Sequence, residues 1–143
     1  MNYEEAVAYI NDTPRFTTKN TLDNTRAVLA AMGHPERKMK LIHVAGSNGK
    51  GSVCAYLASI LTTAGKETGL FISPHLVDIN ERFVINQQPV SNALFLEAFE
   101  AVMDTVRRLL KERPDSFAHP TFFELLFLMG IYIFDKSQIE YAV

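Results

Sequence analysis

The sequence predicts an α/β fold in which helices flank a parallel β-sheet. Three short apolar segments, residues 41–45, 68–73 and 139–143, have the composition of buried strands. A helical pattern separates the first from the second, and this alternation implies a parallel pair joined by a right-handed crossover. Ligands of such sheets bind beyond the carboxyl ends of the strands. We therefore expect Gly49, after the first strand, and Ser73, at the end of the second, to lie at the same sheet edge.

Two helices are predicted before the first strand. Asn2 can cap a helix that runs through Ile10, and Pro14 ends this region. A second helix runs toward Gly33 and Pro35, which together form a stop signal. Its apolar positions are Leu22, Ala27, Val28, Leu29 and Met32.

The helix after the first strand is predicted from about Lys50 to Ala64, just before Gly65. Its expected apolar face is formed by Val53, Tyr56, Leu57, Ile60 and Leu61. Cys54 lies in the same apolar pattern, so we expect a small core residue rather than a reactive thiol. As the single cysteine, it excludes an internal disulfide and a cysteine-built zinc site.

A hairpin and a long helix are predicted next. Residues 81–85 and 89–90 flank the turn Asn86-Gln87-Gln88, and a helix then runs from Ser91 to about Lys111. Within the hairpin we expect Glu81 and Arg82 to form an ion pair, rather than to order a substrate loop.

The last predicted helix opens with Thr121-Phe122-Phe123-Glu124, a capping box, and is apolar on nearly all sides through Phe134. Its apolar run is shorter than the ~18 residues needed to cross a bilayer, so we predict a buried helix. The strand at 139–143 ends the sequence with no loop after it. Since ligand-binding groups normally follow such strands, we expect an incomplete domain of a longer protein.

Composition indicates a soluble globular domain. The chain has 143 residues, of which 48% are hydrophobic and 21% charged, enough for one real core. The formal net charge of −2 provides no basic field, so neither nucleic acid nor an anionic membrane surface is an expected partner. The N-terminus lacks the pattern of a signal peptide, and we expect a cytoplasmic protein.

Residues 46–52, Gly-Ser-Asn-Gly-Lys-Gly-Ser, have the chemistry of a phosphate-binding loop, or P-loop. Glycines let successive backbone N–H groups face an anion, the following helix offers its positive N-terminus, and Lys50 adds a full charge. The common pattern G-x-x-x-x-G-K-[ST] is not met, because two residues instead of four precede Gly-Lys and Gly51 separates Lys50 from Ser52. A tight strand-to-helix connection would explain the glycines but not the lysine and hydroxyl. We predict phosphate binding.

Four motifs in order and spacing resemble the folylpolyglutamate synthase and dihydrofolate synthase family. They are residues 45–52, the Phe-Ile-Ser-Pro-His-Leu run at 71–76, Ile-Asn-Glu-Arg-Phe at 79–83, and Thr-Phe-Phe-Glu at 121–124. This family is similar to the bacterial Mur ligases, which share the shortened loop. The resemblance implies that residues 1–143 are the N-terminal part of a Mur-ligase-like ATP-binding domain. The rest of that domain and a C-terminal glutamate-binding domain would then be absent.

The implied activity is an ATP-dependent amide ligase that joins L-glutamate to folate, to dihydropteroate, or to both. In that family the acceptor carboxylate attacks the γ-phosphate to give an acyl phosphate, which the glutamate amine displaces. Such chemistry asks the protein mainly for positioning and charge neutralisation. The implied cofactors are ATP and Mg²⁺, the partners are these small molecules, and the full-length protein is expected to be a monomer.

The resemblance also implies roles for single residues. Lys50 is the expected catalytic residue, and the nucleotide phosphates are expected to contact Ser47, Asn48, Gly49, Lys50, Gly51 and Ser52. Ser73 is the implied magnesium ligand, with a family glutamate expected beyond Val143. The alternative for Ser73 is a hydroxyl that caps the loop before Pro74. Implied substrate contacts are Ser73, Pro74, His75, Thr121, Phe122, Phe123 and Glu124, with residues 17–20 near the pteroate.

Several alternatives stay open. His75 has no visible acid or metal partner and is as well explained by a structural role. The motif at 121–124 is explained by helix capping alone, although capping and pterin binding are compatible. A P-loop kinase or switch fits less well, because the full loop spacing is missing. A Mur-type peptide ligase, or a nucleotide-binding module without ligase activity, is the alternative function.

Overall fold

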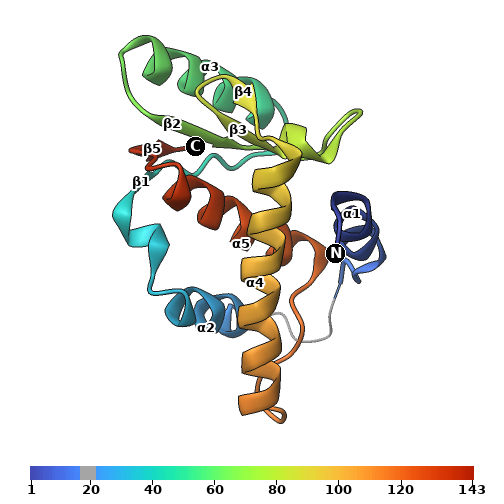
Figure 1. Cartoon of the computed structure of the whole chain (residues 1–143). Helices are drawn as coiled ribbons and strands as arrows, with labels where there is room; N and C mark the ends of the chain where they lie inside the picture. Colours follow the sequence, from blue (N-terminus) through green and yellow to red (C-terminus); the bar gives the residue numbers. More distant parts are fainter. Residues whose placement is uncertain (17–21) are drawn as a thin grey trace.

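The structure is a computed structural model that describes residues 1–16 and 22–143. Its centre is a sheet with the strand order β1-β5-β2-β3-β4 (Figure 1). The strands are β1 (Lys40–Leu41), β2 (Thr68–Phe71), β3 (Phe83–Ile85), β4 (Gln88–Pro89) and β5 (Tyr141–Ala142). The helices are α1 (Tyr3–Asp12), α2 (Asp23–Ala31), α3 (Lys50–Thr63), α4 (Asn92–Glu112) and α5 (Phe122–Lys136), with short 3₁₀ helices η1 (Pro35–Lys38) and η2 (Ile79–Arg82).

The three predicted strands form a parallel group, as expected. β5 lies between β1 and β2 and is parallel to both, so Ala142 pairs with Leu41 on one side and with Gly69 on the other. The last strand of the chain is therefore inserted between the first two. Only long-range packing could place it there, because no local signal specifies strand order.

The sheet as a whole is mixed rather than parallel. The β3–β4 hairpin adds two antiparallel strands beside β2. Its turn consists of Asn86 and Gln87, both with positive φ, of 47° and 71°. This conformation matches the right-handed twist of a two-residue hairpin. The hairpin was predicted, but its attachment to β2 was not.

The strands are shorter than predicted, because a residue belongs to a strand only where it pairs with a residue of a neighbouring strand. β1 was expected over 41–45 and forms ladder pairs only at Lys40 and Leu41. The N–H of Ile42 still donates to the carbonyl of Ala142, at 2.8 Å. The residues after Ile42 then run on to the glycine-rich loop without regular pairing.

Helices cover both faces of the sheet (Figure 1). α3 packs on one face, where a small apolar cluster includes Cys54, Ala58, Leu70 and Val143. α5 lies on the other face and is covered in turn by α4, with α1 and α2 completing the larger core. α5 can approach β2 closely because Gly69 has no side chain. A Cβ there would lie 2.7 Å from the Phe134 ring.

The buried face of α3 differs from the predicted one. Val53, Tyr56 and Ile60 are 47%, 72% and 64% exposed, whereas Cys54 and Ala58 are buried. The small side chains at 54 and 58 let the helix lie close to the sheet, and larger apolar side chains remain outside. The predicted burial of Cys54 is confirmed, and burial raises the pKa of its thiol.

The predicted helix ends are largely confirmed. Asn2 and Glu5 form a capping box at α1, and Ser91 caps α4 through a hydrogen bond from the N–H of Leu94. At α5, the carboxylate of Glu124 accepts the N–H of Thr121 at 3.3 Å.

None of the helices in the described ranges is long and apolar enough to cross a membrane.

Candidate functional site

The glycine-rich loop, residues 46–49, leads directly into the N-terminus of α3. Gly46 and Gly49 adopt φ values of +154° and +77°, which side chains rarely adopt. Gly49 is the N-cap of α3 and offers no side chain to the first-turn N–H groups. An exposed helix N-terminus without a side-chain cap leaves these donors available for an anion. The local geometry is therefore that of a phosphate-binding loop.

Lys50 reaches back across this loop. Its Nζ donates a hydrogen bond to the carbonyl oxygen of Gly46, at the opposite end of the turn. The side chain is exposed, and no ion pair among the described residues includes it. An ammonium group without an ion-pair partner, beside the N-terminus of α3, concentrates positive charge at the mouth of the loop.

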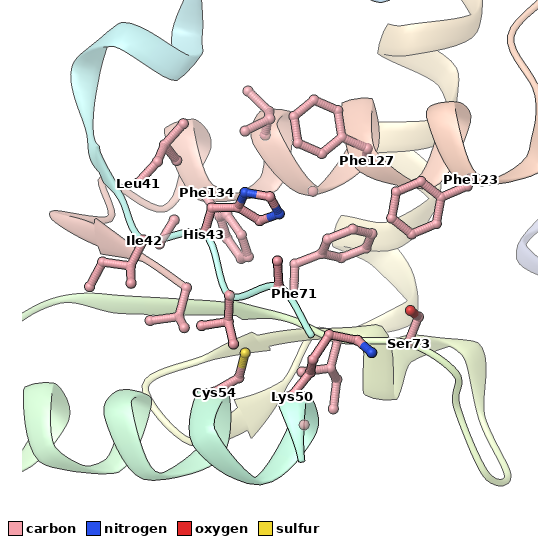
Figure 2. A pocket seen from close by; sticks show the side chains of 18 of the residues that line it. Leu41, Ile42, His43, Lys50, Cys54, Phe71, Ser73, Phe123, Phe127 and Phe134 are labelled. Carbon is pink, nitrogen blue, oxygen red and sulfur yellow. The ribbon is translucent and has the colours of Figure 1, made fainter. Parts of the chain in front are cut away.

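A pocket of about 590 Å³ connects this loop to the ends of the parallel strands (Figure 2). Lys50 and Ser73 both line it, which confirms that the loop and the end of β2 lie at the same edge of the sheet. The remaining wall is largely apolar and includes Phe71, Phe123 and Phe127. Figure 2 shows Lys50 and Ser73 on one side and the phenylalanine rings on the other. The pocket thus offers charged and aromatic surfaces together.

Glu81 orders the loop that follows Ser73. Its carboxylate accepts the backbone N–H groups of Leu76, Val77 and Asp78, at 3.0, 3.0 and 2.8 Å. These three hydrogen bonds lower the pKa of Glu81. No ion pair between Glu81 and Arg82 occurs in the described part of the chain, so that prediction is wrong. Glu81 instead orders the loop, because three backbone donors converge on one carboxylate.

Arg82 and Tyr3 fix the same loop from two other sides. The Nε of Arg82 donates to Nδ1 of His75 at 2.8 Å. The hydroxyl of Tyr3 lies 3.0 Å from side-chain oxygens of both Asp78 and Asn80. Burial and the hydrogen bond with Asp78 raise the pKa of Tyr3 to about 12. The loop is thereby tied to η2 and to α1.

The predicted substrate contacts fall into two groups. Ser73, Pro74, Phe122 and Phe123 line a second cavity of about 280 Å³, which meets the first at Ser73 and Phe123. His75, Thr121 and Glu124 line neither cavity. His75 faces Arg82, and the other two cap α5. The predicted contact region at residues 17–20 lies outside the described residues.

Sequence reasoning missed two residues of the second cavity, Arg15 and Phe16, and gave Arg82 a different role. Arg15 carries no motif and is placed by its neighbour, since the carbonyl of Pro14 accepts the N–H of Phe122 at 2.9 Å. The Asn-Glu-Arg run could have suggested a role for Arg82 in the loop.

The magnesium expectation stays a prediction, because its glutamate ligand was expected beyond Val143. Nowhere in 1–16 or 22–143 do three His, Cys, Asp or Glu side chains gather in a metal-binding group. Ser73 is exposed at the pocket but has no carboxylate cluster around it. Mg²⁺ prefers six oxygen ligands, usually including carboxylates. The described residues alone therefore do not fit a complete magnesium site.

Comparison with models of protein families finds no match. Among individual proteins, the chain is 34% identical over 143 residues to the folylpolyglutamate synthase of Lacticaseibacillus casei, covering 100% of the chain and 33% of that enzyme. It is 30% identical over 143 residues to the dihydrofolate synthase/folylpolyglutamate synthase of Bacillus subtilis, covering 99% of the chain and 32% of the relative. The chain thus spans about a third of the length of these relatives.

Solved structures show the same similarity to folylpolyglutamate synthases. The apo form of the L. casei enzyme superposes with a TM-score of 0.93 at 34% identity, over 100% of this chain and 34% of the other. A structure described as an FPGS complex with AMPPCP and folate also gives 0.93 at 34% identity, with the same coverage. A Mycobacterium tuberculosis folylpolyglutamate synthase complexed with ADP and AMPPCP gives 0.88 at 27% identity, over 99% and 30% of the two chains. The mixed sheet with its flanking helices is therefore the fold of these proteins over about a third of their length.

Proposed function

This chain is related over its full length to the folylpolyglutamate synthase family, and on that premise we propose that its full-length protein is an ATP-dependent ligase of glutamate to folates. The observation that carries the proposal is the meeting of the P-loop and Ser73 at one pocket with aromatic walls. One end of the pocket suits phosphates and the other suits a flat heterocycle. One solved structure of this fold is a complex with AMPPCP and folate.

In the proposed site, the backbone and side chains of Ser47, Asn48, Gly49, Gly51 and Ser52 hold the phosphates. Lys50 neutralises the β- and γ-phosphate oxygens as charge moves during phosphoryl transfer. Its exposed ammonium group, which crosses the loop toward Gly46, supports this role. ATP binding follows the family, of which several structures hold ATP analogues or ADP.

In the proposed reaction, an acceptor carboxylate attacks the γ-phosphate and releases ADP. The glutamate amine then attacks the acyl phosphate, displaces phosphate and forms the amide bond. The contribution of the described residues is to orient the reactants and to neutralise phosphate charge. We propose that Ser73 lies where the γ-phosphate meets the acceptor carboxylate. Mg²⁺, when bound, would neutralise phosphate charge, with Ser73 as one ligand.

The acceptor ring is assigned to the aromatic wall. Phe123 is 50% exposed and lies 5.7 Å from Phe71, ring centroid to centroid. An exposed ring backed by other rings can stack on a pterin. Thr121, Phe122 and Glu124 support the Phe123 ring from the first turn of α5. Pro74 lines the adjoining smaller cavity, and His75 contributes indirectly through its hydrogen bond with Arg82.

The direct test is ADP release by the full-length protein. Release should require both L-glutamate and either folate or dihydropteroate, and comparison of the two acceptors distinguishes the two synthase activities. A Mur-type ligase would need a peptide-precursor acceptor instead. ATP turnover that is indifferent to both glutamate and pteroyl acceptors would favour a kinase or switch, and absence of turnover with retained nucleotide binding would favour a binding module.

A further inference from the structure

Two arginines from distant parts of the chain lie over the same aromatic ring. The Cζ atom of Arg15 is 4.3 Å from the centroid of Phe122, and that of Arg82 is 5.4 Å from it. Phe122 is only 4% exposed, so the ring is a fixed platform for both guanidinium groups. Arg15 is brought there by the hydrogen bond between the N–H of Phe122 and the carbonyl of Pro14.

Neither guanidinium is neutralised by a carboxylate. None of the ion pairs among residues 1–16 and 22–143 includes Arg15 or Arg82, and residues 17–21 contain neither Asp nor Glu. The Nε of Arg82 is used by His75, but its terminal nitrogens have no hydrogen-bond partner among the described residues. Arg82 is only 5% exposed, and the surface that it does expose contributes to the lining of the smaller cavity. Burial, followed by the charge of Arg15, lowers the pKa of Arg82.

These two charges face the smaller cavity of about 280 Å³. The N-terminus of α5 adds positive potential at Phe122, and Glu124 is held at the helix cap by the N–H of Thr121. Two neighbouring guanidinium groups without a carboxylate partner create positive potential at this cavity. The arrangement therefore suits an anionic ligand.

We propose that Arg15 and Arg82 form a carboxylate-binding subsite for the acceptor, beside Ser73. The proposal rests on the proposed function, because an amide ligase must bind an acceptor that carries a carboxylate. A planar guanidinium pairs with a carboxylate through two parallel hydrogen bonds. The P-loop, proposed to hold the nucleotide phosphates, lines the larger cavity, and among the described residues only Ser73 and Phe123 line both cavities. Phe123 lines both cavities and leaves aromatic surface for the rest of the acceptor.

The test compares a charged ligand with a neutral one. Folate and its diamide, in which both carboxylates are replaced, are titrated calorimetrically into the full-length protein, its Arg15→Gln variant and the control Arg26→Gln. Arg15 and Arg26 are both exposed arginines, and Arg26 lies on α2 outside both cavities. Circular dichroism verifies that each variant is folded.

Loss of one charge-assisted pair should weaken folate binding by about tenfold or more in Arg15→Gln. Diamide binding should be unchanged in that variant, and Arg26→Gln should leave both ligands unaffected. Equal weakening of folate and diamide would overturn the subsite, since Arg15 would then contact another part of the ligand. Unchanged folate binding would overturn it as well.

A second probe separates this subsite from the proposed function. If the wild-type protein binds neither folate nor its diamide, the proposed function fails. Glutarate, a dicarboxylate without a ring, then tests the arginine pair directly by thermal shift. Stabilisation by glutarate that is lost in Arg15→Gln supports a carboxylate subsite, whereas no stabilisation of the wild type overturns it.

Discussion

Arg82 donates a hydrogen bond from its Nε to Nδ1 of His75, at 2.8 Å. The residue before it, Glu81, accepts the backbone N–H groups of the next three residues of the same loop. Two consecutive charged side chains of η2 thus hold consecutive parts of the loop that follows Ser73. The Asn-Glu-Arg motif therefore has a structural explanation, which is to keep this edge of the site in one conformation.

The Glu81 contacts predict a pH-dependent loop. The folded-state pKa of Glu81 is lowered below its ordinary value of 4.5, so the stabilisation is complete above that value and is lost as pH falls through the lowered pKa. We expect amide hydrogen exchange at Leu76, Val77 and Asp78, corrected for intrinsic rates, to accelerate only in acid below pH 4.5. NMR exchange measurements on the wild type check this.

A matched pair of variants identifies the group responsible for this effect. Glu81→Gln should accelerate exchange at the same three amides already at neutral pH and remove most of the acid transition. Glu100→Gln, a change at an exposed glutamate on α4, should do neither. Exchange rates that are the same in Glu81→Gln and the wild type would show that the carboxylate does not order the loop.

Lys50→Ala should lower kcat of the full-length protein strongly while leaving the fold intact. The side chain is exposed and makes no contribution to the core, so its removal should affect transition-state charge rather than packing. Loss of one preorganised charge of this type costs about 3 kcal/mol in the barrier, or about a hundredfold in rate.

Steady-state ADP release and circular dichroism measure the two effects of Lys50→Ala together. Lys111→Ala, near the C-terminus of α4, is the matched control and should keep full activity. Activity of Lys50→Ala within a few-fold of the wild type would remove Lys50 from the proposed mechanism.

Gly69→Ala should destabilise the fold by about 1–3 kcal/mol, the usual cost of overpacking a core. The added Cβ would lie 2.7 Å from the ring of Phe134, where α5 packs on β2. Gly130→Ala is the control, because its Cβ would stop 3.4 Å from Phe83 and alanine favours a helix. Urea unfolding of both variants measures the difference.

A further change tests whether the clash with Phe134 is the cause. Phe134→Leu in the Gly69→Ala background should recover part of the lost free energy of unfolding, giving a coupling energy in a double-mutant cycle. Additive losses, or equal destabilisation by Gly69→Ala and Gly130→Ala, would contradict the close approach of α5 and β2.

Residues 1–143 alone should have no ligase activity and at most weak nucleotide binding. The described residues supply a P-loop and Ser73 but no carboxylate cluster for Mg²⁺, so the phosphates would be held incompletely. Calorimetric titration with Mg²⁺ and a non-hydrolysable ATP analogue checks this, with Lys50→Ala to identify binding at the loop. Tight, stoichiometric binding would mean that these residues already contain a complete nucleotide site.

The sequence by itself determined the features that depend on a few neighbouring residues. The cap at Asn2, the turn at Asn86 and the P-loop at the mouth of α3 were all predicted, because their signals lie within one helical turn or one hairpin. The parallel pairing of three apolar strands also followed, since a crossover helix allows little else.

Only the tertiary structure decided which distant residues meet. It inserted β5 between β1 and β2, left Val53, Tyr56 and Ile60 on the exposed side of α3, and placed Arg15 and Arg82 over Phe122. None of these outcomes has a local signal, because each depends on the shape and charge of surfaces formed by separate parts of the chain. Close packing selects among arrangements that the hydrophobic pattern alone leaves equivalent.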